Sequence, residues 1–370
     1  MTRLALRNLF QNKTRLLISV GGVALALLLM LALDAIFAGM QQQVTIYIDR
    51  SRADVFVAQP GVRNMHMASS SLPASLAAQV SAVAGVASVT PILYVTNIVV
   101  AGDQRNLAYL VGLPTGAVAG GPWEVAQGKG VPGPGEAVID EGVARKAGVG
   151  LGDEVEVFGR RLRLVGLARG AATISNSIAF VNADDFTALR NLSGRVSFLL
   201  VRGQTGVTPE ELAARIEAEV DGVTAVSRTT FAAEERRVIR DMGSDLVGIM
   251  NAVGFVIGLA VTALTVYTAT LSRRAEYGVL KAIGAHNRQL YQVVLAQAVI
   301  SVALGLALGL VFTLALQIMV PRLALPLVLA ITPDSMARVG GAALLIAAIS
   351  AVLPIRQIAR LDPALVFRGK

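Results

Sequence analysis

Four long apolar runs dominate the pattern of hydrophobic and polar positions along the chain. Leu16–Leu33 holds eighteen residues without a charge and Leu246–Leu271 holds 26, and further uncharged runs extend over 289–321 and 339–355. About 20 apolar helical residues, rising about 1.5 Å each, cross the roughly 30 Å hydrocarbon core of a bilayer. The pattern predicts four membrane-spanning helices, which we place at 16–40, 246–272, 289–320 and 339–355.

The segment between the first two runs alternates strand-like and helix-like patterns, with turn residues between them. The strand candidates are 53–58, 95–100, 106–111, 137–139, 154–158, 161–165, 178–181 and 196–201. The helix candidates are 73–83, 141–147, 183–189 and 209–220. Thr208 and Glu211 have the spacing of a capping box at the start of the last helix, with Pro209 at its first position. Residues 41–229 are therefore expected to form one α+β domain, and 230–245 a helical stalk leading into the second span.

Composition and charge support a membrane protein and give its orientation. Hydrophobic residues make up 54% of the 370 positions and charged residues 16%, against about 25% charged in an ordinary soluble domain. The net charge of +8 comes from Lys and Arg that concentrate before the first span, in 273–288 and in the tail 356–370. Short loops rich in Lys and Arg stay in the cytoplasm. Both termini and the 273–288 loop are therefore predicted to be cytoplasmic, whereas 41–229 and the short loop 321–338 lie outside.

The predicted fold is thus an α-helical membrane protein with four transmembrane helices and a large extracytoplasmic α+β domain inserted between helices 1 and 2. The basic balance reflects topology, and we expect no nucleic-acid partner. Arg338 and Arg356 flank the fourth run, where their long side chains can snorkel to the interface.

The first fifteen residues allow more than one interpretation. Leu6, Leu9 and Phe10 follow helical spacing among basic residues, which favours a cytoplasmic amphipathic helix over 1–15 lying on the inner membrane surface. A disordered basic tail is the alternative. The basic start followed by an apolar run also fits a signal peptide, although the apolar part of a signal peptide has only about 7–15 residues.

Two cytoplasmic segments carry a family resemblance. Residues 273–285 read RRAEYGVLKAIGA, and residues 353–365 read LPIRQIARLDPAL. The first resembles the R-x-x-E-[IY]-G-x-L-[RK]-A-[IL]-G-A segment of MacB/FtsX-like ABC transporter permeases, and the second is similar to the end of the same proteins, with Ile355 and Ile358 in place of the commoner small residues. The outer segment, with GEAVI at 135–139 and GLGDE at 150–154, looks like their periplasmic core domain.

The 273–288 loop also has a physical interpretation of its own. A short helix starting near Glu276 and carrying Lys281 toward its other end complements the helix dipole, and Gly284 can end it. Such a helix would expose apolar residues, which in a loop too short to have a core indicates a docking partner. The resemblance implies that this is the coupling helix, formed by Glu276, Gly278, Val279, Leu280, Lys281, Ala282, Ile283 and Gly284, of which Val279, Leu280 and Ile283 are expected at the surface. The alternative is an inert loop resting on lipid headgroups.

The chain is not expected to hydrolyse ATP. Gly128-Lys129 is a Gly-Lys pair followed by Gly130 instead of Ser or Thr, and the G-x-x-x-x-G-K-[ST] pattern of a phosphate-binding loop does not occur in the sequence. The resemblance implies a mechanotransmission permease of the four-span type without a fused ATPase, in a prokaryotic cell (inner) membrane. It implies as partners two copies of a cytoplasmic ABC ATPase, which would bind the ATP and Mg, a second permease (homodimer or paralogue), membrane lipid, and an extracytoplasmic adaptor or substrate protein. No cofactor is expected in this chain.

Few residues suggest other chemistry. Met65, His66 and Met67 place two thioethers beside an imidazole, a combination that suits copper or haem iron, although packing in a loop is the simpler interpretation. We therefore expect no metal site and take these three as possible substrate or interface residues. Asp34 lies near the outer end of the first span, where an acid is costly. It marks a dimer interface or substrate entrance, or else lies among the headgroups. The absence of cysteine excludes disulfides and thiolate sites.

Two pairs of glycines in the spans suggest close helix packing. Gly254 and Gly258, and Gly305 and Gly309, form small-xxx-small pairs. We take them as candidates for a dimer seam.

The function predicted from the sequence is export or extraction of an amphiphilic molecule, such as a lipid, lipoprotein, haem, peptide or drug, driven by ATP hydrolysis in the partner. The alternative is an FtsX-like signal transducer that activates an outer partner such as a cell-wall hydrolase. A third possibility is a receptor-like sensor subunit.

Overall fold

The computed structural model describes residues 13–172, 176–190, 192–320 and 327–360. The chain divides into two compact units. One unit runs up to Gly39 and resumes at Gly243, and the other is Met40–Met242. The amphipathic helix expected at 1–15, except its last three residues, and the tail beyond Arg360 lie outside the described residues.

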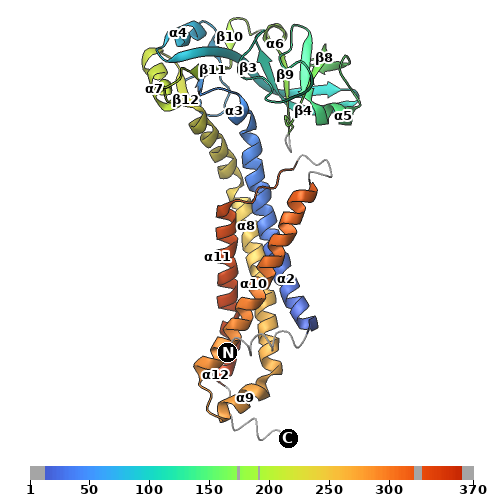
Figure 1. Ribbon diagram of the computed structural model, residues 1–370, viewed down its shortest axis with the longest axis vertical. Helices are drawn as coiled ribbons and strands as arrows, with labels where there is room; N and C mark the ends of the chain where they lie inside the picture. Colours follow the sequence, from blue (N-terminus) through green and yellow to red (C-terminus); the bar gives the residue numbers. More distant parts are fainter. Residues whose placement is uncertain (1–12, 173–175, 191, 321–326, 361–370) are drawn as a thin grey trace. The chain divides into compact units, whose positions relative to one another are not determined.

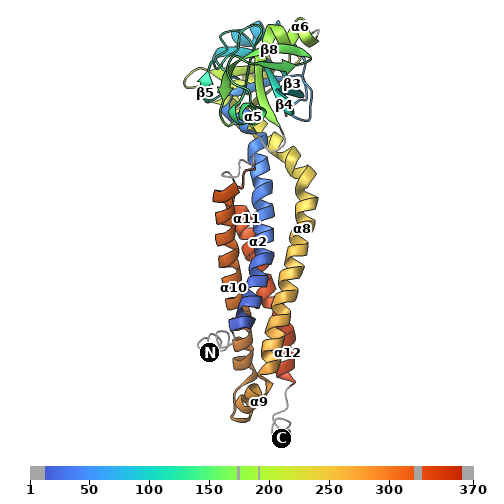
Figure 2. The ribbon, with the colours of Figure 1, turned by 90° about the vertical axis from the view of Figure 1, so that its right-hand side faces the viewer.

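Four long helices make up most of the first unit. They are α2 (Lys13–Val44), α8 (Arg228–Ser272), α10 (Asn287–Met319) and α11 (Pro333–Ser350), and they run side by side in both views (Figures 1 and 2). Each is long and apolar enough to cross a membrane. Two short helices, α9 (Arg274–Ala282) and α12 (Val352–Ala359), lie at one end of this bundle (Figure 1). The predicted stalk and second span are parts of one uninterrupted helix, α8.

The glycines of α8 and α10 pack inside the chain, which corrects their assignment to a dimer seam. An added Cβ at Gly305 would lie 2.6 Å from Val23 Cγ1, and one at Gly254 would lie 2.6 Å from Met30 Cγ. Because contacts below 3.0 Å essentially do not occur for real Cβ atoms, only glycine allows α8 and α10 to approach α2 this closely. These glycines therefore fix the core of the bundle around α2.

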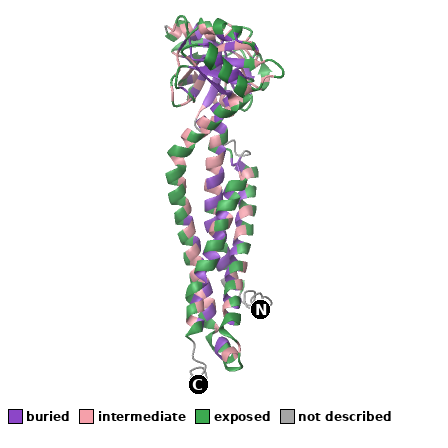
Figure 3. Cartoon of the chain, turned by 90° about the vertical axis from the view of Figure 1, so that its left-hand side faces the viewer, coloured by how far each residue is buried: buried purple, intermediate pink, exposed green. Residues whose placement is uncertain are grey.

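The outward faces of the bundle are strongly apolar, and Figure 3 shows them as long exposed stretches on the helices. The exposed side chains include Leu25, Leu29, Val256, Leu264, Val311, Phe312, Leu344 and Leu345. A soluble monomer rarely exposes contiguous apolar surface of this extent. The bundle is therefore built for an apolar solvent, as expected of helices that face lipid.

The second unit is built on one large sheet. In the described residues its strand order is β12-β1-β11-β3-β4-β9-β6-β8-β5, with β7 pairing β3 and β8. The strands are β1 (Val55–Ala58), β3 (Val86–Ala101), β4 (Gln104–Leu113), β5 (Val125–Gly128), β6 (Glu136–Asp140), β7 (Glu154–Val157), β8 (Arg160–Ala168), β9 (Ser177–Asn182), β11 (Phe198–Gly203) and β12 (Thr224–Ser227), and β2 (Leu72–Pro73) pairs separately with β10 (Arg195–Val196). Most pairs are antiparallel, but β4 with β9 and β6 with β8 are parallel.

The helices of this unit are α3 (Ile46–Arg50), α4 (Leu76–Ala82), α5 (Glu141–Ala147), α6 (Ala183–Arg190) and α7 (Pro209–Glu219). The expected helices 141–147 and 209–220 correspond closely to α5 and α7. Of the capping box expected for α7, the structure shows the half in which Thr208 Oγ1 accepts a hydrogen bond from Glu211 N at 3.3 Å. Both sheet faces are covered, because Val55 and Leu199 pack with α4 and α7 while Phe56 and Leu200 pack in a second core.

Candidate functional site

The short helix α9 is fixed to its neighbours by its inner face. Tyr277 is buried with Val266, Leu290 and Val294, which come from α8 and α10. Burial raises the pKa of the Tyr277 hydroxyl, so this ring stays neutral and packed. Leu280 packs against the same cluster and is only partly exposed, so the expectation that it lies at the surface is wrong.

Lys281 also faces inward, toward the end of α12. Its Nζ donates hydrogen bonds to Ile358 O at 2.9 Å and to Ala359 O at 3.2 Å. These carbonyls belong to the last turn of α12, where a cation satisfies acceptors that the helix leaves unpaired and meets the negative end of the helix dipole. Lys281 therefore holds α9 against α12.

The outer face of α9 is apolar and exposed. Val279 is 43% exposed and Ile283 is 77% exposed, with exposed Ala282 between them. Glu276 lies at the start of this face, where its carboxylate is 3.3 Å from Arg273 Nη1. Gly284 ends the helix at a φ of 96°, a left-handed conformation that suits glycine. An open hollow of about 410 Å³, lined by Lys281, Gly284, Ala285, His286 and Asn287, follows directly.

The two faces of α9 therefore have different roles. The inner face anchors the helix to the bundle, and the outer face presents apolar side chains that nothing in the described part of the chain covers. A rigidly held apolar strip of this kind is suited to contact with a second protein.

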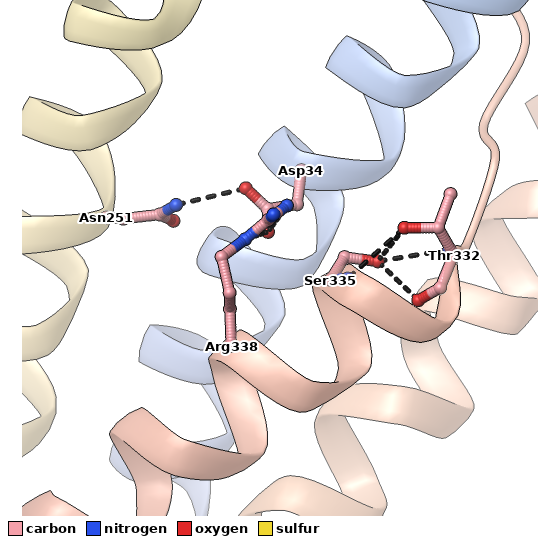
Figure 4. Close-up of polar contacts among 5 residues, drawn as sticks. All are labelled: Asp34, Asn251, Thr332, Ser335 and Arg338. Carbon is pink, nitrogen blue, oxygen red and sulfur yellow. Dashed lines mark hydrogen bonds and ion pairs between the residues drawn. The ribbon is translucent and has the colours of Figure 1, made fainter.

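A second candidate site is a polar cluster inside the bundle around Asp34 (Figure 4). The Asp34 side chain is fully buried, and its Oδ2 accepts hydrogen bonds from Arg338 Nη2 at 3.0 Å and Nε at 3.3 Å. Its Oδ1 accepts one from Asn251 Nδ2 at 3.0 Å. Asp34 thus links α2 to α8 and α11 within the chain, a buried position that does not fit the headgroup alternative. A dimer interface or a substrate entrance at Asp34 stays a prediction.

Arg338 reaches Asp34 because α11 begins earlier than the sequence suggested. Thr332 caps the helix, since its Oγ1 accepts a hydrogen bond from Ser335 N at 3.2 Å, and Pro333 occupies the first turn. The fourth helix therefore starts at Pro333 instead of 339, and Arg338 lies in its second turn instead of flanking it. The predicted snorkelling role is wrong for this residue, because its guanidinium pairs with a buried acid.

The three residues of the Met65–Met67 group occupy different environments. Met65 is buried in the core of the second unit and Met67 is 60% exposed. His66 Nδ1 lies 2.9 Å from Glu235 Oε1. Among the described residues no group of three or more His, Cys, Asp or Glu side chains is arranged to hold a metal ion. A substrate or interface role for Met65, His66 and Met67 stays a prediction.

Sequence reasoning missed Glu235 and Asn251 as partners of these buried groups. Glu235 stood in a run of four charged residues that was interpreted as part of a helical stalk. One signal was available, since Phe231, Ala232 and Glu235 have the spacing of a single helical face. Nothing local marked Asn251, because its partner is 217 positions away.

Comparison with known proteins agrees with this architecture. The family model described as MacB-like periplasmic core domain matches residues 16–219, and the one described as FtsX-like permease C-terminal matches 248–363. An uncharacterized ABC transporter permease of Mycobacterium tuberculosis is 25% identical over 366 residues, covering 99% of both chains. Permeases with the same description from Mycobacterium bovis and Methanocaldococcus jannaschii are 23% and 21% identical and cover 99% of this chain and 99% and 97% of their own.

Two solved structures are also similar to part of the chain. The periplasmic region of MacB from Actinobacillus actinomycetemcomitans has a TM-score of 0.39 and 17% identity, covering 50% of this chain and 92% of that one. The extracellular domain of the transporter YknZ from Gram-positive bacteria has a TM-score of 0.36 and 14% identity, covering 47% and 99%. Together, the two family matches and the four apolar helices identify a multi-pass membrane protein that belongs to the MacB/FtsX-like ABC transporter permeases.

Proposed function

We propose that this chain is the permease subunit onto which a separate cytoplasmic ABC ATPase docks, and that α9 is the docking element. The observation that carries the proposal is the two-faced construction of α9. Its inner face is fixed by Tyr277 and Lys281, and its outer face exposes Val279 and Ile283. Because the inner face of α9 packs directly on α10 and α12, a displacement of α9 would also displace these helices, with no flexible loop between them to absorb it.

The working assembly that we propose is based on what the family resemblance implies. Two ATPase subunits hold ATP and Mg²⁺ and carry out hydrolysis, and two permease chains convert it into movement of the second unit, Met40–Met242, which we call the outer unit. The termini and α9 lie in the cytoplasm of a prokaryotic cell, and 41–229 lies outside the membrane. The outcome we favour is export or extraction of an amphiphilic molecule, to which the apolar outward faces of the bundle are suited.

The docking test uses the permease reconstituted with its ATPase in lipid nanodiscs. Burial of a side chain such as Ile283 contributes about 1.5–3 kcal/mol, which corresponds to about tenfold or more in affinity. Ile283→Asp should therefore weaken ATPase binding at least about tenfold and reduce permease-stimulated hydrolysis accordingly. Leu151→Asp is the matched control, because it places the same charge on an exposed apolar position of the outer unit. Unchanged stimulation in Ile283→Asp would contradict the proposal.

A second experiment distinguishes transport from signalling. The same complex is titrated with lipids, haem, peptides and amphiphilic drugs while ATPase activity and release from vesicles are followed. A compound that stimulates hydrolysis and leaves the membrane supports a transporter. Stimulation only by a protein that binds the outer unit, with nothing released, supports the FtsX-like transducer.

A further inference from the structure

The first turns of α8 are built into the core of the outer unit. Phe231 stacks on Phe56 of β1, with ring centroids 4.6 Å apart and an angle of 7° between the planes. Phe231, Ala232 and Glu235 all have no exposed surface. Burial of the two apolar side chains is favourable, but a fully buried carboxylate needs hydrogen-bond donors to offset its loss of hydration.

Two backbone donors from one segment satisfy one oxygen of the Glu235 carboxylate, and the His66 ring lies beside the other. Oε2 accepts hydrogen bonds from Met65 N at 2.7 Å and from His66 N at 3.4 Å, and Oε1 lies 2.9 Å from His66 Nδ1. The His66 side chain is itself only 8% exposed. Removal of one member of such a pair leaves the other buried and unpaired, so the two behave as a unit.

His66 connects this pair to the middle of the sheet. Its ring meets Tyr109 of β4 edge-on at 4.4 Å and Tyr94 of β3 at 6.0 Å. Burial raises the pKa of both tyrosine hydroxyls, and the nearby Glu235 charge raises them further. Both rings are therefore neutral and form fixed walls around the imidazole. A path of direct contacts thus runs from Glu235 on α8 through His66 to β3 and β4.

Helix α8 is suited to transmit movement from α9 to the contacts of Glu235 and His66. It is continuous from Arg228 to Ser272, and α9 begins two residues later at Arg274. Arg236 adds a contact on the next position, where its Nη1 donates to Thr45 Oγ1 at 3.2 Å. Beyond Arg236, the side chains of Arg237, Arg240 and Asp241 are exposed. The contact with the outer unit is therefore concentrated at 231–236.

We propose that His66 and Glu235 are positioning residues that form the joint through which movement of α8 is transmitted to the outer sheet. The proposal rests on the proposed function, since ATP hydrolysis at α9 must supply the movement. The joint remains closed while it transmits, so that the 62–67 segment and the base of α8 move as one body.

The test measures movement without requiring a known substrate. The chain has no cysteine, so spin labels are placed by Leu151→Cys in the outer unit and Leu344→Cys on α11, both at exposed positions. Pulsed electron paramagnetic resonance gives the distance between the labels in the full complex, before and after trapping with ATP and vanadate. His66→Leu and Glu235→Leu each remove one side of the pair. His66→Asn keeps a polar side chain that can reach Glu235 Oε1, and Glu234→Leu is the control on the neighbouring position of α8.

We expect the wild type, His66→Asn and Glu234→Leu to show the same vanadate-dependent change in distance. His66→Leu should keep its ATPase rate within about twofold and lose the change, and Glu235→Leu should do the same if it folds. The joint proposal is overturned if His66→Leu retains the full change, or if His66→Asn loses it together with His66→Leu. If the wild-type permease does not stimulate the ATPase at all, the proposed function fails, and the joint proposal fails with it.

Discussion

The ion pair inside the bundle predicts an asymmetric response to mutation. Asp34 has no exposed side-chain surface, whereas the Arg338 side chain is 62% exposed. Removal of the arginine by Arg338→Met leaves the Asp34 carboxylate buried without its cationic partner, and this short side chain cannot reach water. Removal of the negative charge by Asp34→Asn leaves a guanidinium whose long side chain can turn outward. The first change should therefore destabilise the bundle more than the second.

The expected magnitudes follow from the partners that remain. After Arg338→Met, only Asn251 still donates to Asp34, and breaking a buried pair in this way costs about 3–5 kcal/mol. After Asp34→Asn, the amide oxygen can still accept a hydrogen bond, so the loss is that of charge assistance, about 1 kcal/mol. The double variant Asp34→Asn/Arg338→Met removes both charges and should be more stable than Arg338→Met alone.

The assay is unfolding of the purified permease in detergent, followed by helical circular dichroism, for the four members of this double-mutant cycle. Ser335→Ala, which changes a neighbouring polar residue of α11, serves as a control for general disturbance of that helix. Equal destabilisation by the two single variants, or additivity in the double variant, would refute the reasoning, because either result would mean that the two charges do not depend on each other.

Three further predictions follow from other parts of the structure. Gly305→Leu should lower the stability of the bundle by about 1–3 kcal/mol, because it forces a side chain into α2. Gly340→Leu is the control, since a Cβ at Gly340 meets nothing within 4 Å. The measurement is the thermal unfolding midpoint of each variant in detergent. Phe231→Ala should cost about 3–5 kcal/mol in the unfolding of the outer unit, measured by near-ultraviolet circular dichroism, and a loss below 1 kcal/mol would contradict its place in the core. The hydrogen bond from Arg169 lowers the pKa of Glu141 below its usual 4.5, so its stabilisation is complete above about pH 4.5 and is lost as pH falls through the lower folded-state value. Arg169→Gln should therefore lower the midpoint at pH 7 and leave it nearly unchanged at pH 2.

Much of the fold could be predicted from the local sequence pattern. Apolar run length is a property of one segment, and it gave four helices of the right kind. Short strands and capped helices such as α5 were accessible for the same reason. The pattern failed where elements depend on distant partners. The first half of β3, for example, is paired with β11 more than 100 positions later.

The candidate sites were harder to predict from the sequence, for a physical reason. Exposed Ile283 was predictable because its motif is contiguous. The inward direction of Leu280 and Lys281 was not, since it is set by α10 and α12. Asp34 was correctly noted as costly in a membrane helix, but its partner is 304 positions away and lies on a helix whose start was misplaced. Polar partners are chosen by the tertiary fold, which no local pattern encodes.

The buried carboxylates of Asp34 and Glu235 obey the same physical requirement, and α8 contributes a residue to each of the two sites. Burial of an acid is tolerated only with enough donors, and each acid finds them in segments far along the chain: Asp34 in Asn251 and Arg338, and Glu235 in the backbone N–H groups of Met65 and His66. On α8, Glu235 and Asn251 are 251 − 235 = 16 positions apart in the sequence. If α8 slid along its own axis by a few ångströms, both sets of hydrogen bonds would break and leave two unpaired acids. The low-energy movements of α8 are therefore those in which its hydrogen-bonded partners move with it.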